Sequence, residues 1–233
     1  MFPNAFRAGP RQMALDLALP ESHARDDFLE APCNAAALAL IEAWPDWPAP
    51  FVALVGPPGA GKSHLGAIWA DQAGARRLAA RDLAATPPAD ALATGALLLE
   101  DAGPKTPEVA LFHLINSAKE EGAFVLMTAR ELPVSWGTGL KDLASRLRAL
   151  PVVALAEPED ALLRAVLVKL FSDRQLNADT EIVEYLARRM ERSLDAARRL
   201  VAELDRETLE TGRRLTRPLA AQVLERIMQP SLI

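Results

Sequence analysis

The sequence predicts an α/β fold in which a parallel sheet is flanked by helices, followed by a small all-helical domain. Three observations carry this prediction. Short apolar runs alternate with helical patterns as far as residue 157, which is typical of a parallel sheet covered on both faces. A glycine-rich turn joins the first apolar run to a helix. From residue 158 onward apolar residues recur at helical spacing, and no strand pattern interrupts them.

The composition suits this fold and excludes several kinds of site. The chain has 233 residues and is half apolar, largely Ala and Leu, which favours helices. Its formal net charge of −5 argues against broad contact with duplex DNA. Cys33 is the single cysteine, so no internal disulfide or cysteine-rich metal site is expected, and the three histidines lack zinc spacing.

Neither a membrane span nor a secretory signal is expected. No apolar run approaches the roughly 20 residues that cross a bilayer. The N-terminus carries Arg7 and Arg11 with no apolar segment behind them, which does not fit a signal peptide. The sequence therefore favours a cytoplasmic protein with no membrane partner.

The predicted elements follow in chain order. Residues 1–30 form an irregular, flexible tail, because the segment is rich in small, polar and breaker residues. Residues 31–157 form the α/β domain, and residues 158–233 form a domain of four helices. Within the α/β domain, helices are expected at 35–44, 62–72, 109–120 and 140–147, and strands at 51–55, 75–80, 96–99, 123–128 and 152–155.

The turn after the first strand matches the phosphate-loop pattern G-x-x-x-x-G-K-[ST]. Its residues, here called the P-loop (residues 56–63), are Gly56, Pro57, Pro58, Gly59, Ala60, Gly61, Lys62 and Ser63. Glycines let backbone N–H groups turn inward around a polyphosphate, the lysine adds positive charge, and the serine hydroxyl can ligate Mg²⁺. The alternative is a glycine turn with an incidental Lys-Ser pair, but a strand before and a helix after favour a site for ATP or ADP with Mg²⁺. His64 follows and is included among the predicted nucleotide-binding residues, although packing is favoured over a catalytic role.

An acidic pair closes the strand at 96–99. Glu100 is expected to hold Mg²⁺, and Asp101 to orient an attacking water as a catalytic residue. The alternative is a pair of solvated acids at a strand end. Because Asp is commoner than Glu at the metal position, the sequence predicts nucleotide binding more strongly than ATP hydrolysis.

Several segments give the chain a family resemblance. An α/β nucleotide domain followed by a helical lid is the arrangement of P-loop AAA+ ATPases. Residues 142–147, DLASRL, resemble the arginine-finger segment of the replication initiator DnaA and its relatives, with Arg146 as the finger. Thr128 lies on the preceding strand, as in that family, and is a candidate sensor residue. In the tail, the sequence QMALDL resembles the Q-x-x-L-x-[LF] peptide that binds the bacterial sliding clamp, with contacts from Gln12, Met13, Leu15 and Leu17.

This layout is similar to that of the Hda family of DnaA regulatory inactivators. The resemblance implies a regulator that binds ADP or ATP, attaches to the sliding clamp (the beta subunit of DNA polymerase III), and presses Arg146 into DnaA-bound ATP. The ATP is hydrolysed and re-initiation is prevented. DNA is reached only through the clamp, and a homo-oligomer is possible. The alternative for Arg146 is a solvated surface arginine, and for the tail peptide a segment that docks on the protein's own core.

Three positions depart from the family pattern. Besides Glu100, Arg130 stands where the family has Asp in its polar sensor, and Asp195 stands where DnaA-like proteins have a phosphate-contacting arginine. Arg198, or its neighbours Arg192 and Arg199, could reach the phosphate instead. These changes predict a weak intrinsic ATPase. The alternatives are an autonomous AAA+ remodeller, or a helicase loader or DnaA paralogue, for which basic helices would be expected after the lid.

Overall fold

The computed structural model describes residues 24–228, which form two compact units. The first, here the α/β unit, contains residues 24–163 together with Arg192–Asp195. The second, here the helical unit, contains Arg164–Glu191 and residues 196–228. The predicted clamp peptide lies outside the described residues.

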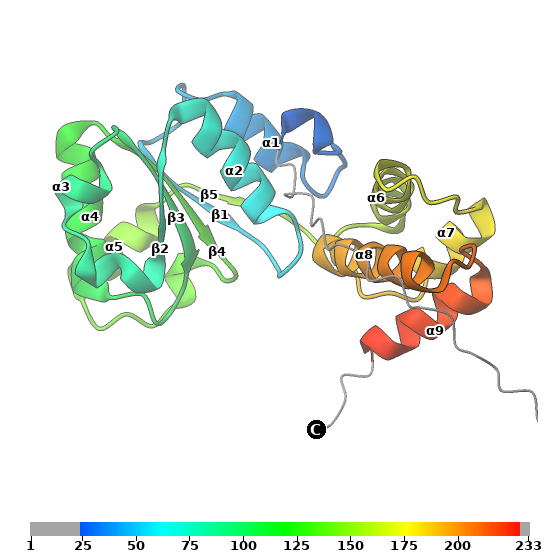
Figure 1. Cartoon of the computed structure of the whole chain (residues 1–233). Coiled ribbons are helices and arrows are strands. Elements are labelled where there is room, and N and C mark those ends of the chain that lie inside the picture. The colour runs from blue at the N-terminus through cyan, green and yellow to red at the C-terminus, as the bar shows by residue number, and fades with distance from the viewer. Residues whose placement is uncertain (1–23, 229–233) are drawn as a thin grey trace, which may run out of the picture. The chain divides into compact units, whose positions relative to one another are not determined.

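A five-stranded sheet with strand order β2-β3-β4-β1-β5 forms the centre of the α/β unit (Figure 1). Every paired strand runs parallel to its neighbour, as the sequence predicts. The strands are β1 (Phe51–Val55), β2 (Arg76–Ala79), β3 (Ala96–Ala102), β4 (Phe124–Ala129) and β5 (Val152–Ala154). Because parallel strands end together at one edge, the segments that follow β1, β3 and β4 meet there.

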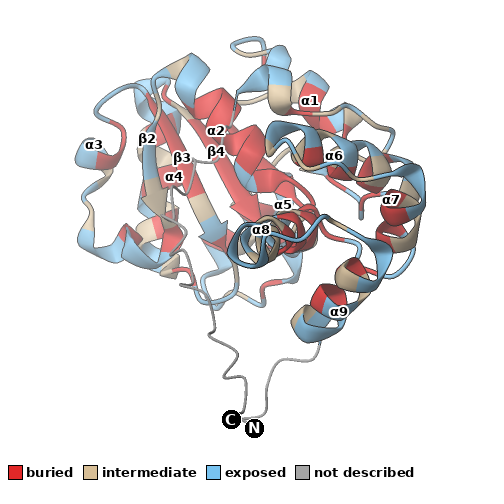
Figure 2. Cartoon of the chain, turned by 45° about the vertical axis from the view of Figure 1, so that its right-hand side comes forward, coloured by how far each residue is buried: buried red, intermediate tan, exposed pale blue. Residues whose placement is uncertain are grey.

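Helices cover both faces of this sheet. The helices of the α/β unit are α1 (Ala35–Glu42), α2 (Lys62–Ala73), α3 (Pro88–Ala91), α4 (Glu108–Glu121) and α5 (Lys141–Ala149). Short 3₁₀ helices are η1 (Arg25–Asp27), η2 (Ala80–Ala85) and η3 (Pro133–Ser135). Val52 and Leu54 of β1 pack with α1 and α2, whereas Ala53 and Val55 pack with α4 and α5. This alternation follows from the two-residue period of a strand, and it buries the central strands on both faces (Figure 2).

The C-terminal elements are helices alone, as predicted. They are α6 (Asp160–Asp173), α7 (Thr180–Ala187), α8 (Leu194–Thr211) and α9 (Arg217–Met228). Their apolar positions, such as Leu186, Leu200 and Val223, are buried. Asp179 caps α7, since its Oδ1 accepts a hydrogen bond of 2.8 Å from the Ile182 N–H. The predicted fold class, a parallel sheet flanked by helices and followed by a helical lid, is therefore confirmed. None of the helices in residues 24–228 is long and apolar enough to span a membrane.

Candidate functional site

The P-loop leaves the carboxyl end of β1 and leads directly into α2. Its first residue is fixed to the neighbouring strand, because the Gly56 N–H donates to the Ala129 carbonyl at 3.1 Å. The N-terminus of α2 follows at Lys62, where unpaired backbone N–H groups and the helix dipole favour an anion. The predicted strand, loop and helix are thus present in the order that a phosphate site needs.

Two glycines of the loop have no room for a side chain. A Cβ on Gly56 would lie 2.7 Å from the carbonyl oxygen of Leu155. A Cβ on Gly59 would lie only 1.9 Å from the Oγ of Ser193, and Gly59 also has a positive φ of 70°. Glycine is therefore required at both positions for steric reasons in addition to any ligand contact.

Lys62 is buried at the centre of the loop. Its Nζ donates to the carbonyls of Gly56 and Pro57 at 2.7 and 2.8 Å. Burial lowers the pKa of Lys62, and the charge of Arg130 lowers it further, whereas Asp101 and Asp195 act in the opposite direction. The ammonium group lies in an environment where a negatively charged ligand would stabilise it.

His64 is buried on the side of α2 that meets the N-terminal segment. Its Nε2 donates to the Ala24 carbonyl at 3.2 Å, and its ring lies edge-on to Phe28 with centroids 5.3 Å apart. These contacts support packing as its main role, and contact with a nucleotide stays a prediction. Ser63, the predicted Mg²⁺ ligand of the loop, is exposed.

The acidic pair lies at the end of β3, beside Thr128 of β4, a predicted sensor residue. Glu100 is half-buried, and Asp101 is exposed with an unusual positive φ of 56°. The Asp101 N–H donates to the Oγ1 of Thr128 at 3.1 Å, where the pairing of β3 with β4 shifts register. The structure therefore joins two predicted site residues by a direct hydrogen bond and holds Asp101 in a strained conformation.

A pocket of about 400 Å³ opens at the same edge of the sheet. It is lined by Asp101, Arg130, Glu131, Arg81, Lys105 and Thr106, among others. Arg130, the residue after β4, is exposed and is also close enough to act on the charge of Lys62. None of the P-loop residues lines this pocket, which shares Asp101 and Arg130 with the predicted site.

The start of α8 packs against the P-loop, which the sequence did not predict. The Leu194 N–H donates to the Gly59 carbonyl at 2.8 Å, and Ser193 is buried beside the same glycine. Asp195 follows within the α/β unit and acts on the charge of Lys62. No local sequence signal would have indicated this contact, because the two segments are distant in the chain.

The predicted lid arginines have other partners or positions. Arg192 Nη2 pairs with Asp160 at 2.6 Å, and Arg199 Nη2 lies 3.9 Å from a carboxylate oxygen of Glu191. Arg198 belongs to α8 in the helical unit. A phosphate contact by any of them stays a prediction.

Arg146 lies on α5, whose buried Leu143 and Leu147 anchor the helix to the sheet face opposite α2. The guanidinium carbon lies 4.9 Å from the ring centroid of Phe112 on α4. Arg146 is only partly exposed and makes no ion pair within residues 24–228.

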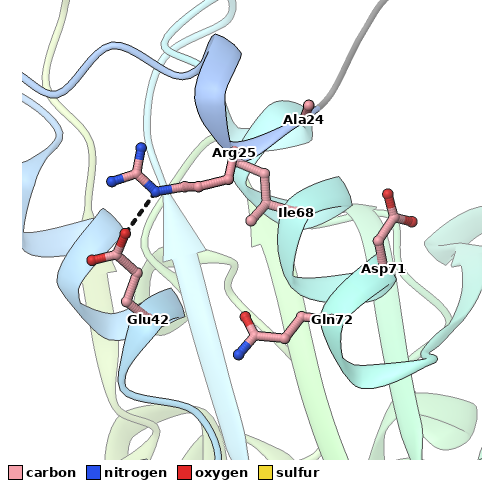
Figure 3. A pocket seen from close by; sticks show the side chains of 6 residues that line it. All are labelled: Ala24, Arg25, Glu42, Ile68, Asp71 and Gln72. Carbon is pink, nitrogen blue, oxygen red and sulfur yellow. Dashed lines mark hydrogen bonds and ion pairs between the residues drawn. The ribbon is translucent and has the colours of Figure 1, made fainter.

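Two further features of residues 24–228 bear on the site. Residues 24–228 contain no group of three or more His, Cys, Asp or Glu side chains placed to hold a metal ion, so magnesium binding by Ser63 and Glu100 stays a prediction. A smaller pocket of about 270 Å³ lies between η1, α1 and α2 (Figure 3). Its rim carries the ion pair between Arg25 and Glu42, 2.6 Å apart, and none of the predicted site residues lines it.

Comparison with known proteins extends the structural result. Residues 160–224 match the family model described as Hda, lid domain. No curated protein matches the sequence. Domain III of the replication initiation protein DnaA from Thermotoga maritima has a TM-score of 0.75 and 19% identity, over 89% of this chain and 98% of that chain.

More distant solved structures share the same fold. AMPPCP-bound DnaA from Aquifex aeolicus has a TM-score of 0.65 and 17% identity, over 91% of this chain and 70% of that chain. The Holliday junction branch migration motor RuvB from Thermotoga maritima has a TM-score of 0.64 and 17% identity, over 88% and 72%. The comparisons thus show a match to an Hda lid model over residues 160–224 and, for the chain as a whole, the fold of DnaA domain III.

Proposed function

We propose that the chain is a regulator of replication initiation that binds nucleotide and stimulates hydrolysis of ATP bound to DnaA. The observation that carries the proposal is the Hda lid match at residues 160–224, joined to an α/β unit of DnaA type. In this proposal residues 31–157 bind the nucleotide, and residues 158–233 act as its lid.

The P-loop is the proposed site for ADP or ATP. Backbone N–H groups at the start of α2 would donate hydrogen bonds to phosphate oxygens, and Lys62 would exchange its bonds to loop carbonyls for bonds to phosphate. The AMPPCP-bound state of Aquifex aeolicus DnaA supports this assignment by fold. Ser63 and Glu100 are the proposed ligands of Mg²⁺, which would neutralise phosphate charge.

The nucleotide is proposed to serve structure more than turnover. Glu100 replaces the commoner Asp, Arg130 adds a cation beside Lys62, and Asp195 adds a carboxylate near the same lysine. With Arg130 as a second cation, and with Glu100 and Asp195 as the acids, these residues do not arrange an attacking water as an active AAA+ ATPase requires. The purified protein should therefore turn over ATP slowly, and a rate comparable to active AAA+ enzymes would overturn this part.

Arg146 is the proposed arginine finger, acting on ATP held by DnaA. A guanidinium at the transferred phosphoryl group stabilises the charge of the transition state, an effect of roughly 10³- to 10⁵-fold in other finger systems. Arg146 is partly exposed and makes no ion pair among the described residues, so its charge is available to a partner.

The decisive experiment measures hydrolysis of DnaA-bound ATP in the presence of clamp-loaded DNA. Wild type should accelerate hydrolysis, and Arg146→Ala should lose the acceleration while still binding ADP. Arg148→Ala is the matched control, because Arg148 is an exposed arginine on the same helix. Absence of stimulation by wild type, or equal stimulation by Arg146→Ala, would refute the proposal.

Attachment to the sliding clamp is proposed for the segment with Gln12, Met13, Leu15 and Leu17. An extended peptide of this kind offers an amide for hydrogen bonds and two leucines for an apolar groove. Replacing Gln12 and Leu15 by alanine should abolish retention on the clamp in a pull-down and leave nucleotide binding intact. Unchanged retention would remove the clamp from the proposal.

An autonomous AAA+ remodeller is the second candidate, favoured by the intact P-loop and the fold shared with the RuvB motor. This candidate predicts ring assembly and rapid ATP turnover by the chain alone. Analytical ultracentrifugation with ATP, combined with a turnover assay without DnaA, separates the two functions.

A further inference from the structure

One face of α4 holds α5 at two points. Glu108 and Phe112 are one helical turn apart on α4 and therefore lie on the same side of the helix. The two carboxylate oxygens of Glu108 accept from the N–H groups of Gly139 and Leu140, both at 3.0 Å, just before α5 begins. One turn along α4, the ring of Phe112 lies beneath the guanidinium of Arg146. The start and the middle of α5 are thus both fixed by side chains of α4.

The contact between Phe112 and Arg146 suits a guanidinium that must keep its donors available. A cation over a ring is attracted by the negative face of the π system, at 4.9 Å in this case. This attraction uses none of the N–H groups that would meet a phosphate, whereas an ion pair with a carboxylate would engage them and offset the charge. Phe112 itself is half-buried and packs against the core on the sheet face covered by α4 and α5, so its ring is held in place.

We propose that Phe112 is a positioning residue that holds the side chain of Arg146 in the orientation needed to meet the phosphate of the partner-bound nucleotide. The inference rests on the proposed function of Arg146 and extends it to a second residue. An arginine side chain has many rotamers, and a fixed guanidinium loses less freedom when it meets its target. The aromatic face of Phe112 is the feature that supplies this restriction.

The contact is tested first without any partner. The ring of Phe112 should shift the side-chain resonances of Arg146 in the NMR spectrum, and Arg146→Lys identifies those resonances by their disappearance. Phe112→Leu should return the shifts to ordinary arginine values, and Phe112→Tyr should retain them. Unchanged shifts in Phe112→Leu would overturn the proposal, irrespective of what Arg146 does to DnaA.

The role is tested next in hydrolysis of DnaA-bound ATP. Phe112→Leu should lower the maximal stimulated rate roughly two- to fivefold, the range of an exposed cation–π contact, with an unchanged half-saturating concentration of regulator. Phe112→Tyr should retain the rate, because the aromatic face is kept. Val109→Ala is the control for the apolar surface of α4, since Val109 is 59% exposed on the same helix.

The outcomes separate positioning from other roles. A raised half-saturating concentration at an unchanged maximal rate would mean that Phe112 binds the partner directly, which contradicts the proposal. Equal losses in Phe112→Leu and Phe112→Tyr would contradict it as well. If Arg146→Ala has no effect on the stimulated rate, the proposed function fails, while the NMR result still decides whether Phe112 holds Arg146.

Discussion

Gly59→Ala changes the P-loop at the point where it meets the start of α8. An L residue in the left-handed region, where Gly59 has a φ of 70°, costs about 1–2 kcal/mol. The new methyl group would lie 1.9 Å from the Oγ and 2.8 Å from the Cβ of Ser193, and overpacking of this kind costs about 1–3 kcal/mol. The two terms together predict a loss of about 2–5 kcal/mol in the free energy of unfolding.

Gly122→Ala isolates the conformational part of this loss. Gly122 has a φ of 66°, nearly that of Gly59, but a Cβ there meets no atom within 4 Å. Urea unfolding followed by circular dichroism should therefore give Gly122→Ala a loss of only about 1–2 kcal/mol. The difference between the two variants measures the steric conflict with Ser193.

A double-mutant cycle locates that conflict. Ser193→Gly removes both the Oγ and the Cβ that a methyl group on Gly59 would meet, and only the Cα, 3.2 Å away, remains close. Gly59→Ala should therefore cost less in the Ser193→Gly background, with a coupling energy of about 1–3 kcal/mol. Additive losses, or equal losses for Gly59→Ala and Gly122→Ala, would show that the P-loop and Ser193 are not packed as described.

Three further substitutions test the charges at the P-loop and the Glu108 carboxylate that binds the N–H groups before α5. Lys62→Ala should abolish ADP binding in isothermal titration calorimetry without unfolding the chain, and retained affinity would exclude the P-loop as the site. Asp195→Asn should strengthen ATP binding severalfold relative to ADP, because a negative charge beside Lys62 is removed, whereas the exposed control Glu191→Gln should not. Hydrogen bonds from the Gly139 backbone, and more weakly from Thr138, hold the pKa of Glu108 below its ordinary value of 4.5. Its stabilising effect is present above pH 4.5 and lost as the pH falls through the lowered pKa, so Glu108→Gln should lower the melting temperature at pH 7 and match wild type in strong acid.

Local patterns were sufficient to predict most of the fold. A continuous apolar run such as residues 51–55 has the length of a strand buried on both faces, and the structure buries all five residues. The predicted strand at 96–99 is longer in the structure, where β3 ends at Ala102. Within the extension, the Thr128 hydroxyl of the neighbouring strand accepts from the Asp101 N–H, and Ala102 pairs with Ala129. A periodicity argument cannot detect such a bond, because it joins residues that are far apart in the sequence.

The candidate site was predicted only in part, because some of its contacts join residues that are far apart in the sequence. The P-loop is a contiguous motif whose residue types follow from phosphate chemistry, so the sequence specifies it completely. The contacts of Leu194 with Gly59 and of Phe112 with Arg146 are tertiary, and each residue alone resembles an ordinary helix position. The short α3 and the 3₁₀ helices also escaped prediction, because so few residues give no periodicity.

The charges around Lys62 explain why a nucleotide would stabilise this fold even without turnover. A buried ammonium whose pKa is lowered by desolvation and by Arg130 is unfavourable in the folded state, and phosphate oxygens would relieve both effects. A ligand that binds only the folded state at 100 times its Kd adds about 2.7 kcal/mol to stability. Because Gly59 accepts a hydrogen bond from Leu194, a loop held by phosphate also holds Leu194. The P-loop can thus act as a structural site, and the catalytic group of the proposed reaction is Arg146, at a second nucleotide bound by DnaA.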